Sequence, residues 1–482
     1  MGDNGPRSRP GEREGDDLHS SSHTATPVAT RHDLAATTAE RREVGRQSRV
    51  LAPREEIGEW DKAHRGHDAL ETIVAQNGIR LAELVPLRHQ RMALSPWNFY
   101  RGAAAVMAAD LASRPHSRLE VQLCGDAHVL NFGLWATPER NLNFDLRDFD
   151  ETLPGPFEWD VARLATSLVV AARDNGVRPA RAEAAVTAAV ETYRRRMRSY
   201  ASLPEIDIWY DGLQAEQFVG YFETADQGEV KIQIEKGKAK RTSRGAFAKL
   251  TTMARGRPRI TTRPPLRATI DDDEQGDIVN HLLAGYRETL QDDRRALFDR
   301  FTPVDMVRQV VGVGSVGMVV YLVLLTGRSG SDPLFLQCKQ AGPSVYESHT
   351  YPSTHGNHGA RVIAGKRMLQ SATDIFVGWG SLGGRDYYVR QYRDMKIIPK
   401  TKLIAPVFVP FATACGKTLA RAHARSGDPV AIDAYMGKGK SFTEAIWRFA
   451  FLYADQNEQD HARLVSAIRR GQVEGDPTED VP

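Results

Sequence analysis

Four carboxylates lie within seven residues of this chain, at Asp145, Asp148, Asp150 and Glu151. Like charges at this density repel one another and oppose a compact fold unless cations lie among them. Arg147, the one basic residue in the stretch, cannot balance four acids. The sequence therefore predicts that a divalent metal ion is bound here. The alternative is that the acids cap the following helix or lie on a solvated turn.

A short loop before these acids, GDAHVLN, carries a second polar cluster. Asp126 and Asn131 are five positions apart between two strand-like stretches, so their side chains can converge on one point. A carboxylate in such a place accepts the proton of a hydroxyl or orients it, and an amide oxygen is a hard ligand for Mg²⁺. His128 has three interpretations, as a metal ligand, a proton shuttle or a side chain that stabilises the loop.

A glycine-rich hairpin with a lysine lies about 180 residues further along. Gly312, Gly314 and Gly317 precede a β-prone run, a turn and then Lys339 in FLQCK. Glycines let backbone N–H groups approach phosphate oxygens, and a lysine on the paired strand can hold the same phosphates. A dinucleotide-binding fingerprint would need a helix after the glycines, whereas a strand is predicted here. An incidental lysine in a bulged hairpin is the structural alternative.

The composition is that of a soluble globular protein. The chain has 482 residues, 41% hydrophobic and 26% charged, with a net charge of +3. Such a charge predicts no strong general attraction to nucleic acid or membrane. Three widely spaced cysteines form no disulfide or zinc pattern, and the longest apolar run is too short to span a bilayer. With no apolar segment after the basic N-terminus, we expect no signal peptide and a cytoplasmic protein.

Two segments stand apart in composition. Residues 1–50 are rich in Gly, Ser, Thr and charge, which predicts a disordered tail. Residues 231–267 hold twelve Lys or Arg and one acid. They read either as a solvated loop or as a surface that binds an anionic ligand.

The longer motifs resemble a known bacterial family. RHQRMALSPWNFYRGAAAVMAADLA, VQLCGDAHVLNFG, FDLRDFDETLPGPFEWDVARLATSLVVAAR, VGVGSVG, ATDIFVGW, YYVRQYRDMK and LARAHARSGD are similar to the family catalogued as domain of unknown function 2252. The resemblance runs from about Pro53 to Gly471, and membership implies no particular reaction.

That family is in turn similar to the protein-kinase-like superfold, especially its aminoglycoside phosphotransferase branch. The branch's catalytic loop HGDxxxxN is matched from the glycine onward, and Cys124 stands where its His would be. The resemblance implies Asp126 as the catalytic residue and Asn131 as a metal ligand. Asp145 holds the place of the metal-binding Asp, with Asp148 as the competing register. Asp160 would anchor the loop.

One feature departs from that order, because the glycine-rich loop and Lys339 follow the catalytic loop instead of preceding it. We therefore expect an α+β, kinase-like bilobal fold that is circularly permuted. The large lobe would comprise residues 51–300 and 397–471, the small nucleotide-binding lobe 301–396, and the C-terminal tail 472–482. Glu347 is the candidate partner of Lys339, although the helix predicted after it contains no acid.

The resemblance implies an ATP- or GTP-dependent phosphotransferase that uses Mg²⁺ and an unknown acceptor. Two alternatives stay open, namely a nucleotide-binding pseudokinase and a metal-dependent hydrolase built on Asp126, His128, Asp145 and Asp148. Four basic residues ahead of the loop could bind an anionic acceptor or pair with the acids: Arg88, His89, Arg91 and Arg101.

Overall fold

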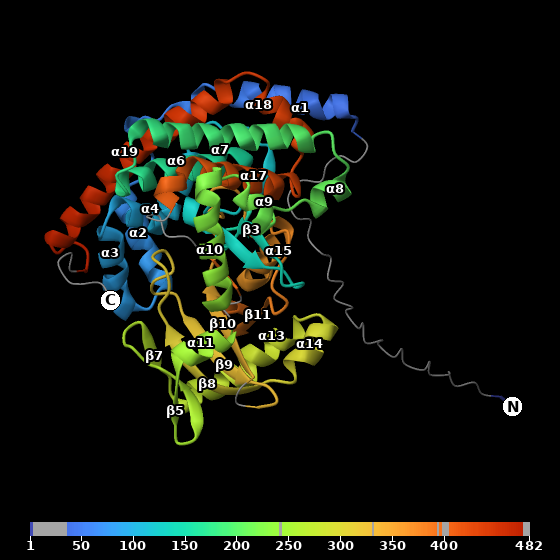
Figure 1. Ribbon diagram of the computed structural model, residues 1–482, viewed down its shortest axis with the longest axis vertical. Coiled ribbons are helices and arrows are strands. Elements are labelled where there is room, and N and C mark those ends of the chain that lie inside the picture. Colours follow the sequence, from blue (N-terminus) through green and yellow to red (C-terminus); the bar gives the residue numbers. More distant parts are fainter. Residues whose placement is uncertain (3–35, 241–242, 330–331, 393–394, 398–403, 476–482) are drawn as a thin grey trace.

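The structure is a computed structural model that describes residues 1–2, 36–240, 243–329, 332–392, 395–397 and 404–475. It confirms the α+β class. Helices from both ends of the chain gather at the top of Figure 1, and an antiparallel sheet with its covering helices lies below them. The polar loops of interest lie where these two parts meet.

The large sheet has six strands in the order β11-β12-β10-β9-β8-β7. Its strands are β7 (Arg267–Thr269), β8 (Thr302–Gln309), β9 (Val320–Thr326), β10 (Pro333–Ala341), β11 (Gly378–Leu382) and β12 (Arg385–Gln391). The predicted hairpin is confirmed, since β9 and β10 pair antiparallel. Both faces of β9 are buried, because Leu322 and Leu324 join one apolar cluster while Val323 and Leu325 join another.

Each face of this sheet has its own cover. One is packed by the π-helical turn Ile278–Leu283, α13 (Ala284–Glu288) and α14 (Asp292–Phe298), which follow α12 (Asp272–Asp277) in the chain. The other is packed by α11 (Ser243–Leu250) and the hairpin of β5 (Thr251–Ala254) and β6 (Arg257–Ile260).

The loop interpretation of residues 231–267 is therefore wrong. The segment comprises the end of α10 (Thr224–Lys240), then α11, β5, β6 and the start of β7. Ala246, Leu250 and Ile260 bury themselves on the sheet, which provides the apolar contact that makes the segment fold. Apolar residues are sparse among the many basic ones in this segment, so the sequence pattern did not predict its helices and strands.

The helical part is built around α6 (Phe157–Asp174), which is buried along almost its whole length. α7 (Pro179–Tyr200) packs against α17 (Phe408–Ala424) from the other end of the chain. The remaining major elements are α2 (Ala69–Ala75), α3 (Val85–Ala93), α4 (Pro96–Gly102), α5 (Ala104–Ala112), β1 (Glu120–Gln122), β2 (Phe132–Ala136), β3 (Leu142–Leu146), β4 (Pro154–Pro156), α8 (Glu205–Tyr210), α9 (Ala215–Val219), α15 (His358–Leu369), α18 (Pro429–Met436) and α19 (Ser441–Arg469).

The tail predicted for residues 1–50 overlaps an ordered helix. α1 (Thr38–Leu51) begins with a capping box between Thr37 and Glu40. It docks on α18, where Arg41 forms a bidentate ion pair with Asp428 at 2.7–2.8 Å. Local capping and this distant partner order a segment whose composition is poor in apolar residues. Residues 3–35 lie outside the described part of the chain.

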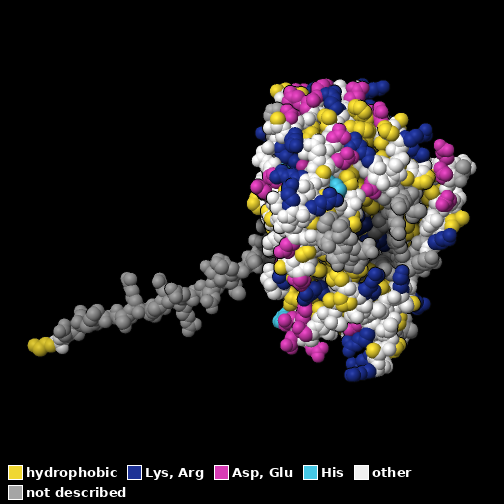
Figure 2. All heavy atoms as spheres, turned by 90° about the vertical axis from the view of Figure 1, so that its left-hand side faces the viewer, with side chains coloured by type: hydrophobic (Ala, Val, Ile, Leu, Met, Phe, Trp, Pro, Cys, Tyr) yellow, Lys and Arg dark blue, Asp and Glu magenta, His cyan; other side chains and the backbone are white. Residues whose placement is uncertain are grey.

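The surface mixes both charges. Figure 2 shows Lys and Arg side chains interspersed with Asp and Glu over one face of the molecule, with apolar side chains scattered among them. Within the described ranges, no helix combines the length and apolarity that crossing a membrane requires.

Candidate active site

The loop after β1 is held from beneath by a buried carboxylate on α6. Asp160 accepts hydrogen bonds from the backbone N–H of Cys124 at 2.6 Å and of Gly125 at 3.1 Å. His423 of α17 contacts the same carboxylate at 3.2 Å. Gly125 has φ +84°, and a Cβ there would lie 2.2 Å from the carbonyl oxygen of Glu151. The loop is thus fixed by elements from both halves of the chain.

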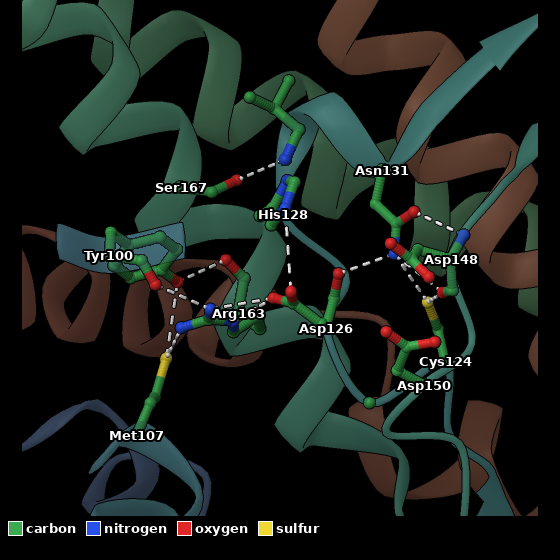
Figure 3. A network of polar contacts seen from close by, with 12 residues as sticks. Tyr100, Met107, Cys124, Asp126, His128, Asn131, Asp148, Asp150, Arg163 and Ser167 are labelled. Atoms are coloured by element: carbon green, nitrogen blue, oxygen red, sulfur yellow. Dashed lines mark hydrogen bonds and ion pairs between the residues drawn. The ribbon is translucent and has the colours of Figure 1, made fainter. Parts of the chain in front are cut away.

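Asp126 projects from this loop onto a buried arginine (Figure 3). Arg163 of α6 contacts Asp126 Oδ1 through two nitrogens, at 2.8 and 2.9 Å, and its guanidinium lies 4.1 Å from the ring centroid of Tyr100. The second oxygen, Oδ2, has His128 Nε2 at 3.6 Å. Burial, with Arg101 and Arg163 nearby, lowers the pKa of His128 to about 4 against the pull of Asp126. The imidazole is therefore neutral at pH 7.

Asn131 fastens the loop to the acidic segment. Its Nδ2 donates to the carbonyl oxygens of Asp126 and Asp148, at 2.8 and 2.9 Å, and to Cys124 Sγ at 3.3 Å. Its Oδ1 accepts from the backbone N–H of Asp148 at 2.7 Å. Figure 3 shows Cys124, Asn131 and Asp148 grouped in this way. The thiol at Cys124 therefore takes part in the loop's internal bonding.

Lys339 reaches this segment from the middle of β10. Its Nζ bonds to Asp150 Oδ2 and lies 3.9 Å from Asp148 Oδ1. Tyr388, the partner of Lys339 on β12, donates to Asp150 Oδ1 at 2.8 Å. Although burial opposes ionisation of both acids, Lys339 and Arg147 lower the pKa of Asp148, whereas burial and the charge of Asp148 raise that of Asp150.

The other acids of the cluster have structural partners. Asp145 is buried, with Arg421 Nη2 at 2.6 Å from Oδ1 and the N–H and hydroxyl of Ser371 each at 2.8 Å from Oδ2. Glu151 accepts from the backbone N–H of Val345 at 2.8 Å. Side chains from the C-terminal half thus supply cations that the local sequence lacks, so charge balance alone does not require a metal ion.

The glycine-rich segment joins β8 to β9 and is tied to the helices before the loop. Gly312 and Gly317 have φ of +69° and +88°. Arg91 donates to the carbonyl of Gly312 at 2.9 Å, and Arg80 donates to that of Gly314 at 2.8 Å. The carbonyl of Gly317 accepts from the backbone N–H of Leu81 at 2.8 Å.

Two adjoining cavities meet at these groups. The larger, of about 810 Å³, has a size typical of small-molecule sites. Basic side chains dominate its polar lining: Arg147, Lys249, Lys339, Lys366, Arg390 and Lys396. The smaller, of about 120 Å³, is lined by Asp126, His128, Asp150 and Gly314 among others. Arg147, Asp148, Gly312 and Ser315 line both, so the two cavities adjoin at these residues.

Four residues singled out in the sequence line neither of these cavities: Asn131, Asp145, Gly317 and Glu347. Glu347 accepts from the N–H groups of Ser344 and Ser353 and lies 3.8 Å from Arg361 Nε. Glu347 is not among the hydrogen-bond or ion-pair partners of Lys339. Asp150 takes the place that was expected for Glu347.

Sequence reasoning named Asp150 only as one of the acids and missed Arg163, Lys366 and Arg390. A guanidinium within an otherwise apolar helix, as in DVARLATSLVV, was the available signal for Arg163. Of the four basic residues ahead of the loop, Arg88 is buried among Gln76, Asn77 and backbone carbonyls. His89 bonds to the carbonyl of Glu474.

The fold and site define an α+β protein with a polar centre between a helical part and a sheet. The family described as "Uncharacterized protein conserved in bacteria (DUF2252)" matches residues 80–467. The chain belongs to this family. No curated protein and no solved structure matches it significantly.

Proposed function

We propose that this protein is a nucleotide-dependent phosphotransferase with a kinase-like, circularly permuted architecture. The observation that carries the proposal is the contact of Lys339 with Asp148 and Asp150 at the junction of two cavities, one of which also contains Asp126. Phosphoryl transfer needs groups that position the transferred phosphoryl group and neutralise its charge. A lysine, a glycine-rich turn, paired carboxylates and a loop aspartate can do this.

The order of elements supports the architecture. β8, the glycine-rich segment, β9, β10 with Lys339, α15, β11 and β12 follow one another as expected of a small nucleotide-binding lobe. The loop of Asp126 comes from the N-terminal half but meets Lys339 in space. The distance of 3.9 Å between Lys339 Nζ and Asp148 Oδ1 is what a permuted chain requires.

The nucleotide would lie in the larger cavity. Its phosphates would be held by Lys339 and the backbone of the segment at Gly312. Lys366 adds a positive charge nearby, although burial and Arg390 lower its pKa to about 8. Lys366 contacts the rings of Trp135 and Phe149. Ring contacts compensate a buried ammonium only partly, which suits a group that awaits an anion.

The carboxylates fit a Mg²⁺ ion that arrives with the nucleotide. Asp148 Oδ1 is buried and has no hydrogen-bond partner among the described residues. Asp150, two residues along the chain, is ion-paired with Lys339. Asn131 Oδ1 accepts from the backbone N–H of Asp148 and lines neither cavity, so it would have to turn toward the ion to add an amide oxygen. The described residues contain no cluster of three acidic, His or Cys side chains arranged to bind a metal ion. Phosphate oxygens of the nucleotide would therefore complete the coordination shell of the Mg²⁺ ion. The ion would neutralise phosphate charge.

Asp126 would act on the acceptor. Its Oδ1 is fixed by Arg163, which leaves Oδ2 toward the smaller cavity with only His128 nearby. In this role Asp126 orients the acceptor hydroxyl and takes its proton as the new O–P bond forms. Arg163 holds the carboxylate in one orientation, which makes it a positioning residue.

A nucleotide-binding protein without turnover is the second candidate. The observation in its favour is that Lys339, Asp148 and Asp150 already satisfy one another, as they would in a site that binds without reacting. A metal-dependent hydrolase has less support, because Asp145 is buried against Arg421 and lines neither cavity.

The test is calorimetric titration of the full chain with ATP and with GTP, each with Mg²⁺, followed by an assay of nucleoside diphosphate release. Lys339→Met should weaken nucleotide binding at least about 10-fold. Asp126→Asn should leave binding intact and lower turnover roughly 10²- to 10⁴-fold. Two exposed residues give matched controls, Lys438→Met and Asp292→Asn, which should behave as wild type.

The outcomes separate the candidates. Binding with no turnover, unaffected by Asp126→Asn, would favour the binding protein. Hydrolytic activity without nucleotide, unaffected by Lys339→Met, would favour the hydrolase. Absence of nucleotide binding in the wild type would contradict the proposal.

A further inference from the structure

The smaller cavity is lined by a partly buried arginine that has no hydrogen-bond or ion-pair partner among the described residues. Arg101, at the end of α4, lines this cavity, and its Nε is buried without a hydrogen-bond partner. None of its nitrogens lies within ion-pair distance of a described carboxylate, although Asp126 and Asp148 act on its charge from further away. A cation that is largely removed from water and has no counterion within contact favours binding of an anion from outside the protein.

A second cation faces the same space. Arg147 lines both cavities, and its side chain has no hydrogen bond or ion pair with a residue that the structure describes. The charges of Asp148 and Asp126 act on Arg147, but neither carboxylate lies within ion-pair distance of its side chain. Arg101 and Arg147 therefore both line this cavity, and neither side chain has a partner among the described residues.

The other arginines around the loop are not like these two. Arg163 forms an ion pair with Asp126, and Arg80 donates to the carbonyl oxygens of Gly314 and Val316. Arg88 donates hydrogen bonds to the side chains of Gln76 and Asn77 and to two backbone carbonyls. Arg101 and Arg147 are thus set apart by their contacts, and both lie beside the group that would orient the acceptor.

The cavity's volume limits what it can take. About 120 Å³ equals roughly four water molecules at liquid density. This is enough for one tetrahedral or planar oxyanion with a short carbon chain. Guanidinium groups bind phosphate and carboxylate oxygens through paired N–H donors.

We propose that the phosphoryl acceptor is a small anionic alcohol whose phosphate or carboxylate group is bound by Arg101 and Arg147 while its hydroxyl lies at Asp126. This inference rests on the proposed phosphotransferase function. The hydroxyl oxygen forms a bond to the γ-phosphorus as the bond from that phosphorus to the β–γ bridging oxygen breaks. The proton goes to Asp126, and the nucleoside diphosphate leaves with the electron pair.

The first experiment measures binding of four probes to the full chain without nucleotide: inorganic phosphate, glycerol 3-phosphate, glycerate and glycerol. The anionic probes should bind and glycerol should not, and the better of glycerol 3-phosphate and glycerate identifies the preferred oxyanion. Arg101→Gln should weaken anion binding about 10- to 100-fold, with Arg101→Lys in between. Arg42→Gln, an exposed change on α1, is the matched control.

A paired variant locates the anion. Arg101 lines only the smaller of the two cavities and Lys366 only the larger. If Lys366→Gln weakens anion binding and Arg101→Gln does not, the anion lies in the nucleotide cavity and the inference is overturned. Equal binding by wild type and Arg101→Gln, with unchanged thermal unfolding, also overturns it.

Turnover measurements distinguish the proposed anionic acceptor from the proposed phosphotransferase activity on which it rests. With ATP and Mg²⁺, Arg101→Gln should raise the acceptor's KM and leave the nucleotide's KM unchanged. Turnover that accepts glycerol as well as glycerol 3-phosphate would overturn the anionic acceptor and leave the phosphotransferase standing. Anion binding that depends on Arg101 without any nucleotide turnover would keep the oxyanion site and contradict phosphoryl transfer.

Discussion

At the residue scale, the two aspartates that compete for the metal role differ in what they touch. Asp145 has a buried guanidinium and Ser371 on its two oxygens, and neither oxygen is left for a ligand. Asp148 keeps a buried oxygen without a hydrogen-bond partner among the described residues, at the wall shared by two cavities. Asp145 therefore has structural partners, and the proposed metal role falls on Asp148.

A pair of isosteric changes tests this division. Asp148→Asn should lower phosphotransfer roughly 100-fold, because it removes the proposed metal ligand. It should also lower the free energy of unfolding by about 1 kcal/mol, because Lys339 loses one of its two carboxylate partners and keeps Asp150. Asp145→Asn should lower the free energy of unfolding by about 3 kcal/mol, because it leaves the charge of Arg421 buried without a counterion. Urea unfolding and the nucleotide assay measure both. The reverse pattern would restore Asp145 to the metal site.

His128 gives the molecule a predicted acid sensitivity. Its pKa is about 4 in the folded chain, against 6.5 for an ordinary histidine, because burial opposes the charged form. Between these values the unfolded chain binds a proton that the folded chain does not. The free energy of unfolding should therefore decrease as pH falls from 6.5 to 4, by roughly 3 kcal/mol from this residue. His128→Gln should remove that contribution, so equal pH dependence of variant and wild type would refute it.

Partners at this scale could not be predicted from the sequence. Asp126, Asn131 and Lys339 were found because short motifs mark them, and the structure places them around one centre. The ion pair of Asp145 with Arg421 joins residues 276 positions apart. No local pattern reports such a pair, so four clustered acids looked as if they needed a metal ion.

At the element scale, the loop Cys124–Asn131 depends on a close backbone approach. Gly125 combines a positive φ with a Cβ position 2.2 Å from Glu151 O, so Gly125→Ala meets both strain and a clash. Gly256, in the turn between β5 and β6, has φ +76° and open space around it. Gly256→Ala should cost about 1 kcal/mol from φ alone, and Gly125→Ala should cost more and abolish nucleotide turnover. Equal losses of stability would show that the contact is unimportant.

Elements with strong periodicity were predictable, and those ordered by distant partners were not. The β9–β10 hairpin follows from its β-prone run and turn. α1 is polar and needs α18 to be stable. The basic segment after Lys231 folds because a few apolar residues meet the sheet.

At the scale of the whole molecule, helices from the two ends of the chain form one packed unit. α7 and α17 meet at Gly416, where a Cβ would lie 2.1 Å from the carbonyl oxygen of Ala189. Because that obstacle is backbone, Gly416→Ala must push the two helices apart, and we expect a loss of about 1–3 kcal/mol in the free energy of unfolding. Gly285→Ala is the matched control, since Gly285 lies in helix α13 with nothing near its Cβ position. There alanine should stabilise by up to about 1 kcal/mol through helix propensity. Chemical unfolding of both variants measures the difference. If Gly416→Ala is as stable as the wild type, α7 and α17 pack less closely than the structure places them, and the large lobe is not built from both ends of the chain at this contact.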